Sequence, residues 1–242
     1  RGATAGMEVG YAWVAQAAGV AGVQLSSVSA AAASLGTLSS LWMGLGPWPQ
    51  VQNVRRLGTL EAINMQTLSC ALLNGGAWFI YTFLIDVFEA VPVNGFNTVV
   101  TLGLLAVVFS SVQGGEKRQA ALHATVPVAV LVALAAYGYV GGKHSAEAHN
   151  IGMLTSTIGL LLYAAPLSEV PTMLGTRSAG TLSLFGVSAS LVCSMSWLLV
   201  GILSKSAPIA TPNLIGVVLS LLQLSIVVVL PSAAAVKAAK KA

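Results

Sequence analysis

The chain alternates between long apolar stretches and short polar breaks. Each stretch is roughly 18–25 residues long, and a helix of about 20 residues crosses the hydrocarbon core of a bilayer, which is about 30 Å thick. The pattern therefore predicts an all-α membrane protein with seven transmembrane helices. We expect these helices at residues 28–51, 63–85, 91–111, 122–140, 151–173, 181–203 and 212–230.

Residues 1–27 are harder to assign. The run from Met7 to Val23 is apolar and rich in Gly and Ala, yet it is short and contains Glu8 and Gln16. We favour an interfacial helix or an extended segment, and an eighth span is the alternative. The first residue is Arg1 rather than Met, so we expect a processed or truncated chain.

Composition strengthens the membrane assignment. Hydrophobic residues make up 56% of the chain and charged residues only 7%, whereas soluble domains carry about 25% charged residues. The net charge of +4 arises from cations in short breaks, without a basic block interleaved with aromatics, so nucleic acid is not an expected partner. Cys70 and Cys193 both lie in apolar stretches, which predicts unpaired thiols rather than a disulfide.

The distribution of cations predicts the orientation, because cytoplasmic loops of membrane proteins are enriched in Lys and Arg. Seven spans place these residues on one side: Arg55, Arg56, Lys117, Arg118, Arg177, Lys237, Lys240 and Lys241. The other side has only Arg1, Lys143 and Lys205. We therefore expect the amino terminus outside and the carboxyl terminus on the cytoplasm-equivalent side.

The chain also contains an internal repeat at an offset of 119 residues. At this offset two prolines, two tryptophans and two asparagines coincide without a gap: Pro47 with Pro166, Trp78 with Trp197, and Asn94 with Asn213. Three spans invert the chain, so one further helix lets the second three-helix unit enter with the orientation of the first. The predicted order is 3+1+3. Its parts are an extension (1–27), a first repeat (28–111), a linker helix with its loops (112–148), a second repeat (149–231) and a basic tail (232–242).

Several motifs resemble the SWEET (MtN3/saliva) family of sugar transporters. The run from Leu162 to Val170 resembles the fifth SWEET helix, the run from Trp197 to Gly201 the end of the sixth, and Pro212-Asn213 the start of the seventh. In the first half, the run from Trp78 to Tyr81 and the segment Val93-Asn94-Gly95 play the matching parts. The resemblance extends over about residues 28–230 and implies a pair of parallel three-helix bundles, the arrangement for which SWEETs are a known example.

The repeated tryptophans and asparagines are the candidate substrate-binding residues. An indole offers a flat apolar face and one N–H donor, and an amide offers donors and an acceptor without charge, which together suit a sugar. Core packing or an interfacial belt would equally explain Trp78 and Trp197. Bonds between helices or helix-start capping would explain Asn94 and Asn213. The family resemblance implies that these two asparagines contact the substrate.

Pro47 and Pro166 are candidate hinges, because proline removes a backbone hydrogen bond and kinks a helix. The resemblance implies two further hinge prolines, on the second and sixth helices. This sequence has Asn64 and Ser183 at those positions. Half of the expected hinge set is therefore missing, which puts efficient alternating access in question.

The remaining chemistry favours passive transport. The acid closest to mid-depth is Glu169, and coupled transporters need an ionisable group along their path. His144 and His149 lack the thiolates or carboxylates of a metal site, and we find no catalytic or cofactor-binding motif. We therefore predict a non-enzymatic uniporter for a neutral sugar, without a metal or cofactor, in a plasma membrane or endomembrane.

A second hypothesis keeps the fold but not the transport. The absent start methionine, the two missing prolines and the unfamiliar extension are also typical of a structural subunit in a larger organellar complex, for example in a thylakoid membrane. Small residues at 26–34 and at Gly6 and Gly10 could form a tight lateral contact with such a complex or in a homo-oligomer.

Overall fold

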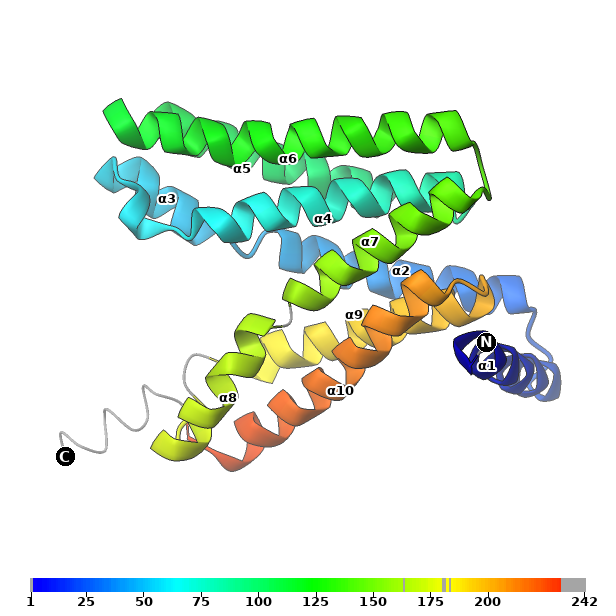
Figure 1. The fold of residues 1–242 in the computed structure, drawn as a ribbon. Coiled ribbons are helices and arrows are strands. Elements are labelled where there is room, and N and C mark those ends of the chain that lie inside the picture. The colour runs from blue at the N-terminus through cyan, green and yellow to red at the C-terminus, as the bar shows by residue number, and fades with distance from the viewer. Residues whose placement is uncertain (1, 163, 180–181, 183, 232–242) are drawn as a thin grey trace. The chain divides into compact units, whose positions relative to one another are not determined.

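The computed structural model describes residues 2–162, 164–179, 182 and 184–231 of the chain, and the regular elements within them are all helices (Figure 1). In order they are α1 (Gly2–Val20), α2 (Leu25–Gly44), α3 (Trp48–Leu57), the 3-10 helix η1 (Leu60–Ala62), α4 (Met65–Leu84), α5 (Val91–Ser111), α6 (Gly114–Gly141), α7 (Ala146–Leu162), α8 (Ala164–Thr176), α9 (Leu184–Leu203) and α10 (Ala207–Val229).

The predicted membrane architecture is confirmed. Within the described residues, 6 helical runs are long and apolar enough to cross a membrane. They are the run Leu25–Leu57 and the helices α4, α5, α6, α9 and α10. The fifth predicted span, 151–173, corresponds to α7 and α8, between which residue 163 lies outside the description. The chain is therefore an all-α membrane protein with helices in the order 3+1+3.

Several helix boundaries differ from the prediction, among them the start of α6 at Gly114 rather than at residue 122, and two of these differences have identifiable reasons. The first span breaks after Gly44 and resumes at Trp48, with Pro47 as the residue that begins α3. The last span begins at Ala207 rather than at Pro212, because the Ser206 hydroxyl accepts a hydrogen bond from the Ile209 N–H (3.4 Å) and caps the helix earlier. Pro212 consequently lies inside α10.

The amino-terminal segment is helical, so the extended interpretation of residues 1–27 is wrong where α1 forms. Helix α1 is not among the runs that qualify as candidate membrane spans. It combines Gly and Ala with two polar residues, Glu8 and Gln16.

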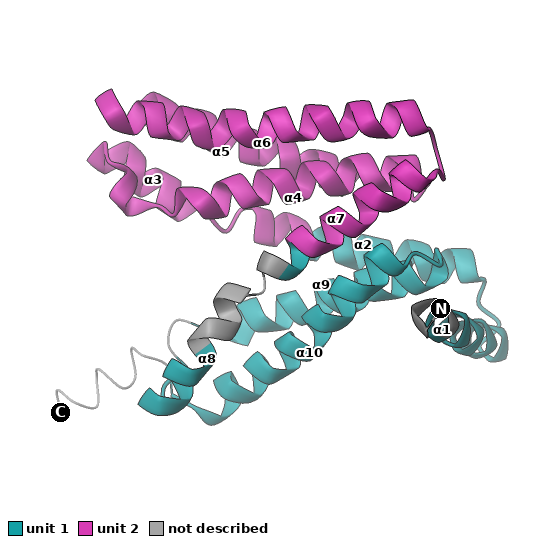
Figure 2. Cartoon of the chain, in the orientation of Figure 1, with its two compact units in different colours: residues 1–39, 159–242 teal, residues 40–158 magenta. Residues whose placement is uncertain are grey.

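The chain divides into two compact units, which Figure 2 colours separately. Unit 1 contains residues 1–39 and 159–242, and unit 2 contains residues 40–158. The two boundaries, after Ser39 and after Ile158, are one repeat length apart. The helices α2 and α7 each therefore contribute a first part to one unit and a last part to the other.

Unit 2 is built around α4, which packs against α5 and α6. Its core is a continuous aliphatic cluster: Val51, Val54, Leu60, Ile63, Met65, Leu68, Leu72, Leu104, Leu105, Val108, Val112 and Ala120. Gly76 lets the Leu131 side chain of α6 lie directly on the α4 backbone. In the same way, Gly152 in the first part of α7 receives the ring of Tyr81.

In unit 1 the helices α9 and α10 form the closest pair. A Cβ atom on Gly201 would lie 2.6 Å from the Ala210 backbone nitrogen, so only glycine permits this approach. Gly36, in the first part of α2, lies against Trp197 of α9. The first parts of α2 and α7 thus pack on equivalent helices of opposite repeats.

The backbone follows the 119-residue repeat closely. Helices α4 and α9 begin and end at equivalent residues, as α3 and α8 do at their last residue. The left-handed residues after α3 and α8 are Gly58 (φ 70°) and Arg177 (φ 48°), again one repeat apart. The left-handed residues after α4 and α9, Asp86 (φ 57°) and Lys205 (φ 51°), obey the same offset.

Candidate functional site

Trp78 and Asn94 lie on neighbouring helices of unit 2. Trp78 is half-buried in α4, with its ring 5.9 Å from that of Tyr81 between centroids. Half-buried Asn94 is in the first turns of α5. The two helices approach closely there, because a Cβ on Gly75 would lie 3.8 Å from the Asn94 carbonyl oxygen.

Trp197 and Asn213 occupy the equivalent helices of unit 1, and both are half-buried. The indole of Trp197 packs directly on α2, since a Cβ on Gly36 would lie 2.9 Å from its Cε2 atom and 3.0 Å from Nε1. The two tryptophans of the repeat therefore have different neighbours.

The two asparagines share one bonding pattern. Asn94 Nδ2 donates to the Ala90 carbonyl at 2.8 Å, and Asn213 Nδ2 donates to the Ile209 carbonyl at 2.7 Å. Both side chains thus bond one turn back along their own helices, so helix-start capping is not their role. Each bond uses one of the two amide hydrogens, and an amide has one more donor hydrogen and an acceptor oxygen for a hydroxyl.

The candidate hinge positions have diverse local structures. Pro47 lies in the break between α2 and α3, and Pro166 lies within α8. Asn64 caps α4, with its side-chain oxygen accepting a hydrogen bond from the Thr67 N–H (3.2 Å). Asn64 therefore stabilises a helix start, which a proline there would not do. Ser183 lies outside the described residues.

Two polar residues of unit 2 were missed by the sequence reasoning. The side-chain oxygens of Asn74 in α4 and Asn97 in α5 are buried without a hydrogen-bond partner. A Cβ on Gly44, at the end of α2, would lie 2.6 Å from the Asn97 oxygen. Buried unpaired amides are rare and call for an explanation. The available signal was an asparagine within an apolar stretch.

A histidine inside a span was also missed. Half-buried His123 in α6 has its Nδ1 atom 2.8 Å from the hydroxyl oxygen of Ser69 in α4. That hydroxyl also lies 2.9 Å from the His123 carbonyl and 3.1 Å from the Met65 carbonyl, so it joins α4 to α6. An ionisable group in a membrane helix was the signal for this contact.

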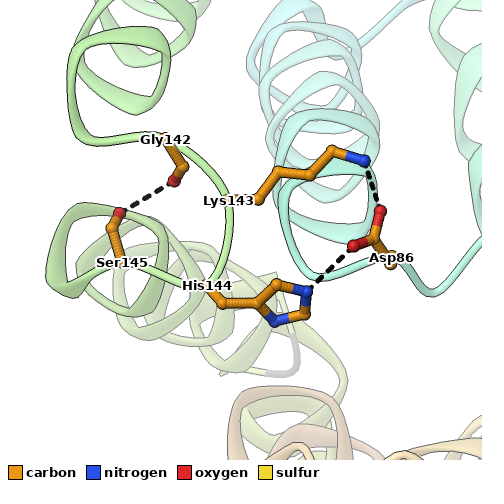
Figure 3. A network of polar contacts seen from close by, with 5 residues as sticks. All are labelled: Asp86, Gly142, Lys143, His144 and Ser145. Carbon is orange, nitrogen blue, oxygen red and sulfur yellow. Dashed lines mark hydrogen bonds and ion pairs between the residues drawn. The ribbon is translucent and has the colours of Figure 1, made fainter.

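An ionic network joins the corner between α4 and α5 to the loop between α6 and α7 (Figure 3). Asp86 binds the Lys143 ammonium through one carboxylate oxygen and the His144 Nε2 atom, at 2.9 Å, through the other. The Lys143 ammonium and then the His144 ring hold the pKa of the Asp86 carboxyl below its ordinary value. Lys143 also lies over the rings of Phe83 and Phe88, at 5.0 and 5.2 Å from their centroids.

Comparison with known proteins identifies relatives of this chain. Residues 149–235 match a family model described as "Sugar efflux transporter for intercellular exchange" (MtN3_slv). Sugar transporter SWEET1 of Mus musculus is 29% identical over 215 residues, which cover 87% of this chain and 92% of the relative. Bidirectional sugar transporter SWEET4 of Oryza sativa subsp. indica is 25% identical over 206 residues, with coverages of 84% and 80%.

The fold also has a solved counterpart. The structure of a eukaryotic SWEET transporter at 3.7 Å resolution superposes with a TM-score of 0.77, covering 84% of this chain and 96% of that one. Sequence identity across this superposition is 16%, so the likeness concerns the fold. The family model, the relatives and the solved structure thus agree with the resemblance seen in the sequence.

Proposed function

Because this chain is a SWEET-family protein, we propose that it is a facilitated transporter, a uniporter, for a neutral sugar. The substrate would bind midway through the membrane, between the two repeats. Trp78 and Trp197 would stack on the apolar face of the sugar, and Asn94 and Asn213 would bond its hydroxyls. The names of the relatives support a sugar as the substrate.

The matched bonding of the two asparagines is the observation that carries this proposal. Each amide is held to its own helix by one bond of 2.7–2.8 Å, which fixes its direction without using all its bonding groups. Neutral amides can replace the water around a hydroxyl without placing charge in the bilayer. Two such groups, at equivalent positions of two repeats, suit a ligand with hydroxyls on both sides.

The proposed movement uses the breaks in the first and fifth spans. Each unit boundary lies within the helix that precedes a candidate hinge, Pro47 or Pro166. A relative movement of the units would therefore bend the chain near these prolines, where backbone hydrogen bonds are missing. We further propose that the amino terminus is outside and the carboxyl terminus on the cytoplasm-equivalent side, in a plasma membrane or endomembrane. The excess of cations on one side supports this orientation.

The second candidate, a structural subunit without transport, is favoured by one observation. Asn64 stands where the family resemblance implies a hinge proline, and it caps α4 instead. A capped helix start is stiffer than a proline hinge. In this case the protein would purify in mild detergent together with other subunits, for example those of a thylakoid complex, instead of alone or as a small homo-oligomer.

Sugar uptake into proteoliposomes tests the proposal directly. We expect labelled glucose or sucrose to enter down its gradient, to exchange in counterflow, and to be unaffected by a pH gradient. Asn94→Ala and Asn213→Ala should each lower uptake by about fivefold, since a lost hydrogen bond to substrate costs about 1 kcal/mol. Asn53→Ala, at an exposed position of α3, is the matched control. Equal uptake in all variants would refute the site, and no uptake by the intact protein would favour the structural role.

A further inference from the structure

Helix α1 is held against the end of α9 by contacts within unit 1. A Cβ on Gly10 would lie 3.4 Å from the side chain of Ile202. The Lys205 ammonium lies 3.4 Å from the Glu8 carboxylate and 4.8 Å from the centroid of the Tyr11 ring. The helix is therefore attached at the corner where α9 turns into α10.

The direction of α1 differs from that of its neighbours. In Figure 1, α1 is seen nearly along its axis, whereas α9 and α10 are seen from the side. Since α9 and α10 are long and apolar enough to cross the membrane, a helix that runs across them extends along the membrane plane. Its attachment to Lys205 places it at the level where these two spans end.

The two faces of α1 have different environments. Ala18 lies on the packed face and is only 7% exposed. Val9, Trp13 and Val20 are 58%, 71% and 87% exposed. Positions 9, 13 and 20 are spaced by four and seven residues, so they form one stripe along a helix of 3.6 residues per turn. The exposed stripe thus carries three large apolar side chains, with the uncharged amide of Gln16 between Trp13 and Val20.

We propose that α1 lies at the boundary between lipid headgroups and acyl chains, with the stripe formed by Val9, Trp13 and Val20 inserted into the lipid. Tryptophan is enriched at this level of a membrane, where its ring is in hydrocarbon and its N–H reaches water. The acid on this helix, Glu8, is paired with Lys205 and lies away from the stripe. Because α9 and α10 can cross the membrane, the lipid around them would continue over the adjoining α1. This continuity favours lipid as the partner of the stripe formed by Val9, Trp13 and Val20.

The proposal can be tested with nitroxide labels in proteoliposomes, starting from a chain in which Cys70 and Cys193 are replaced by Ala. In power-saturation measurements, labels at Val9→Cys and Val20→Cys should be more accessible to oxygen than to a water-soluble nickel complex. They should also report the same shallow depth. A label at Ala18→Cys, on the packed face, is the control and should be poorly accessible to both reagents. Trp13→Ala should increase the mobility of both labels on the stripe.

Other environments would give other results. If α1 crossed the membrane, the depths at positions 9 and 20 would differ by about 16 Å, the length of eleven helical residues. Low access to both reagents on the stripe would indicate a covering protein or second copy, and high access to nickel would indicate water. Any of these three results would overturn the proposal. Lys205→Glu should free α1 and mobilise the labels, and adding Glu8→Lys should restore their immobility in part.

Discussion

The two repeats share a backbone but differ in the side chains placed on it. The corner after α4 and the corner after α9 both turn through a left-handed residue, at Asp86 and Lys205. Asp86 binds the loop that leads into α7, whereas Lys205 binds α1, which precedes α2. The same local geometry thus attaches a different segment in each unit, with opposite charge.

Their interiors differ in the same manner. The close approach of α9 to α10 depends on Gly201, whereas the equivalent residue of α4 is Thr82, buried and bonded to the Trp78 carbonyl at 2.7 Å. In unit 2, the side chain of Asn97 packs directly on Gly44, whereas the repeat-equivalent of Asn97 is Gly216. The fold therefore tolerates exchange of side chains between the repeats where the backbone turns are kept, and we expect such exchange to fail at the closest helix contacts.

The largest loss of stability should come from giving the second repeat, at its tightest helix contact, the residue that the first repeat has there. Gly201→Thr introduces a Cβ only 2.6 Å from the Ala210 nitrogen and 2.9 Å from its Cα, so the two helices must separate. We expect a loss of about 3 kcal/mol or more, because backbone atoms cannot rotate away. Heating in detergent followed by size-exclusion chromatography measures this destabilisation as a loss of the folded peak at a lower temperature.

The control is Gly103→Thr, at a helical glycine of α5 with no atom within 4 Å of the added Cβ. It should leave the elution profile almost unchanged. If Gly201→Thr is equally harmless, the close contact of α9 and α10 does not set their packing.

A smaller effect is expected at the end of α2. Gly44→Ala should lower both thermal stability and sugar uptake, because the new methyl group would lie 2.6 Å from the Asn97 oxygen. Asn97→Ala in the same chain should remove the conflict, with a coupling energy of about 1–2 kcal/mol between the two sites. A double-mutant cycle on the melting temperature measures the coupling, and additive effects would show that the two residues act independently.

Asp86 and Lys205 are the left-handed residues of the two corners, and replacing each by glycine should change the stability of the protein by different amounts. Lysine in this conformation costs about 1 kcal/mol, which glycine avoids, so Lys205→Gly should offset the loss of its exposed ion pair. Asp86→Gly gains less, because aspartate tolerates this conformation better, and it loses two partners. We expect Lys205→Gly to be the more stable variant in the same melting assay, and the reverse order would contradict this account.

The smallest effect concerns pH. The pKa of Asp86 is lowered by Lys143 and His144, so its contribution to stability is present above the ordinary aspartate pKa of about 4 and is lost as the pH falls through the lowered value. The intact protein should therefore lose slightly more stability than Asp86→Asn between about pH 5 and pH 3. Parallel pH profiles of the intact protein and Asp86→Asn would show that the network of Asp86, Lys143 and His144 does not contribute to stability.

The sequence predicted the number and order of the spans because a membrane helix needs a long apolar run, which is visible in any window. It also predicted the repeat, since proline, tryptophan and asparagine are distinctive residues. It missed the early start of α10, because the cap at Ser206 is a single hydroxyl that hydropathy does not register. It gave no sign that Trp197 packs on Gly36, or that Asn97 meets Gly44, because these contacts join residues from separate helices.

The sharing of α2 between the units has a consequence for biosynthesis. Its first part packs against α9 at Gly36 and Trp197, although α9 is made roughly 160 residues later. At about 5–20 residues per second, the ribosome needs about 10–30 s to produce that neighbour. We therefore expect the first part of α2 to remain unpacked in the membrane until α9 has been made. Helix α7 should pack at once, because its partner α4 is already present. Cross-linking of stalled nascent chains at Gly36 in α2 and at Gly152 in α7 would reveal the difference in timing.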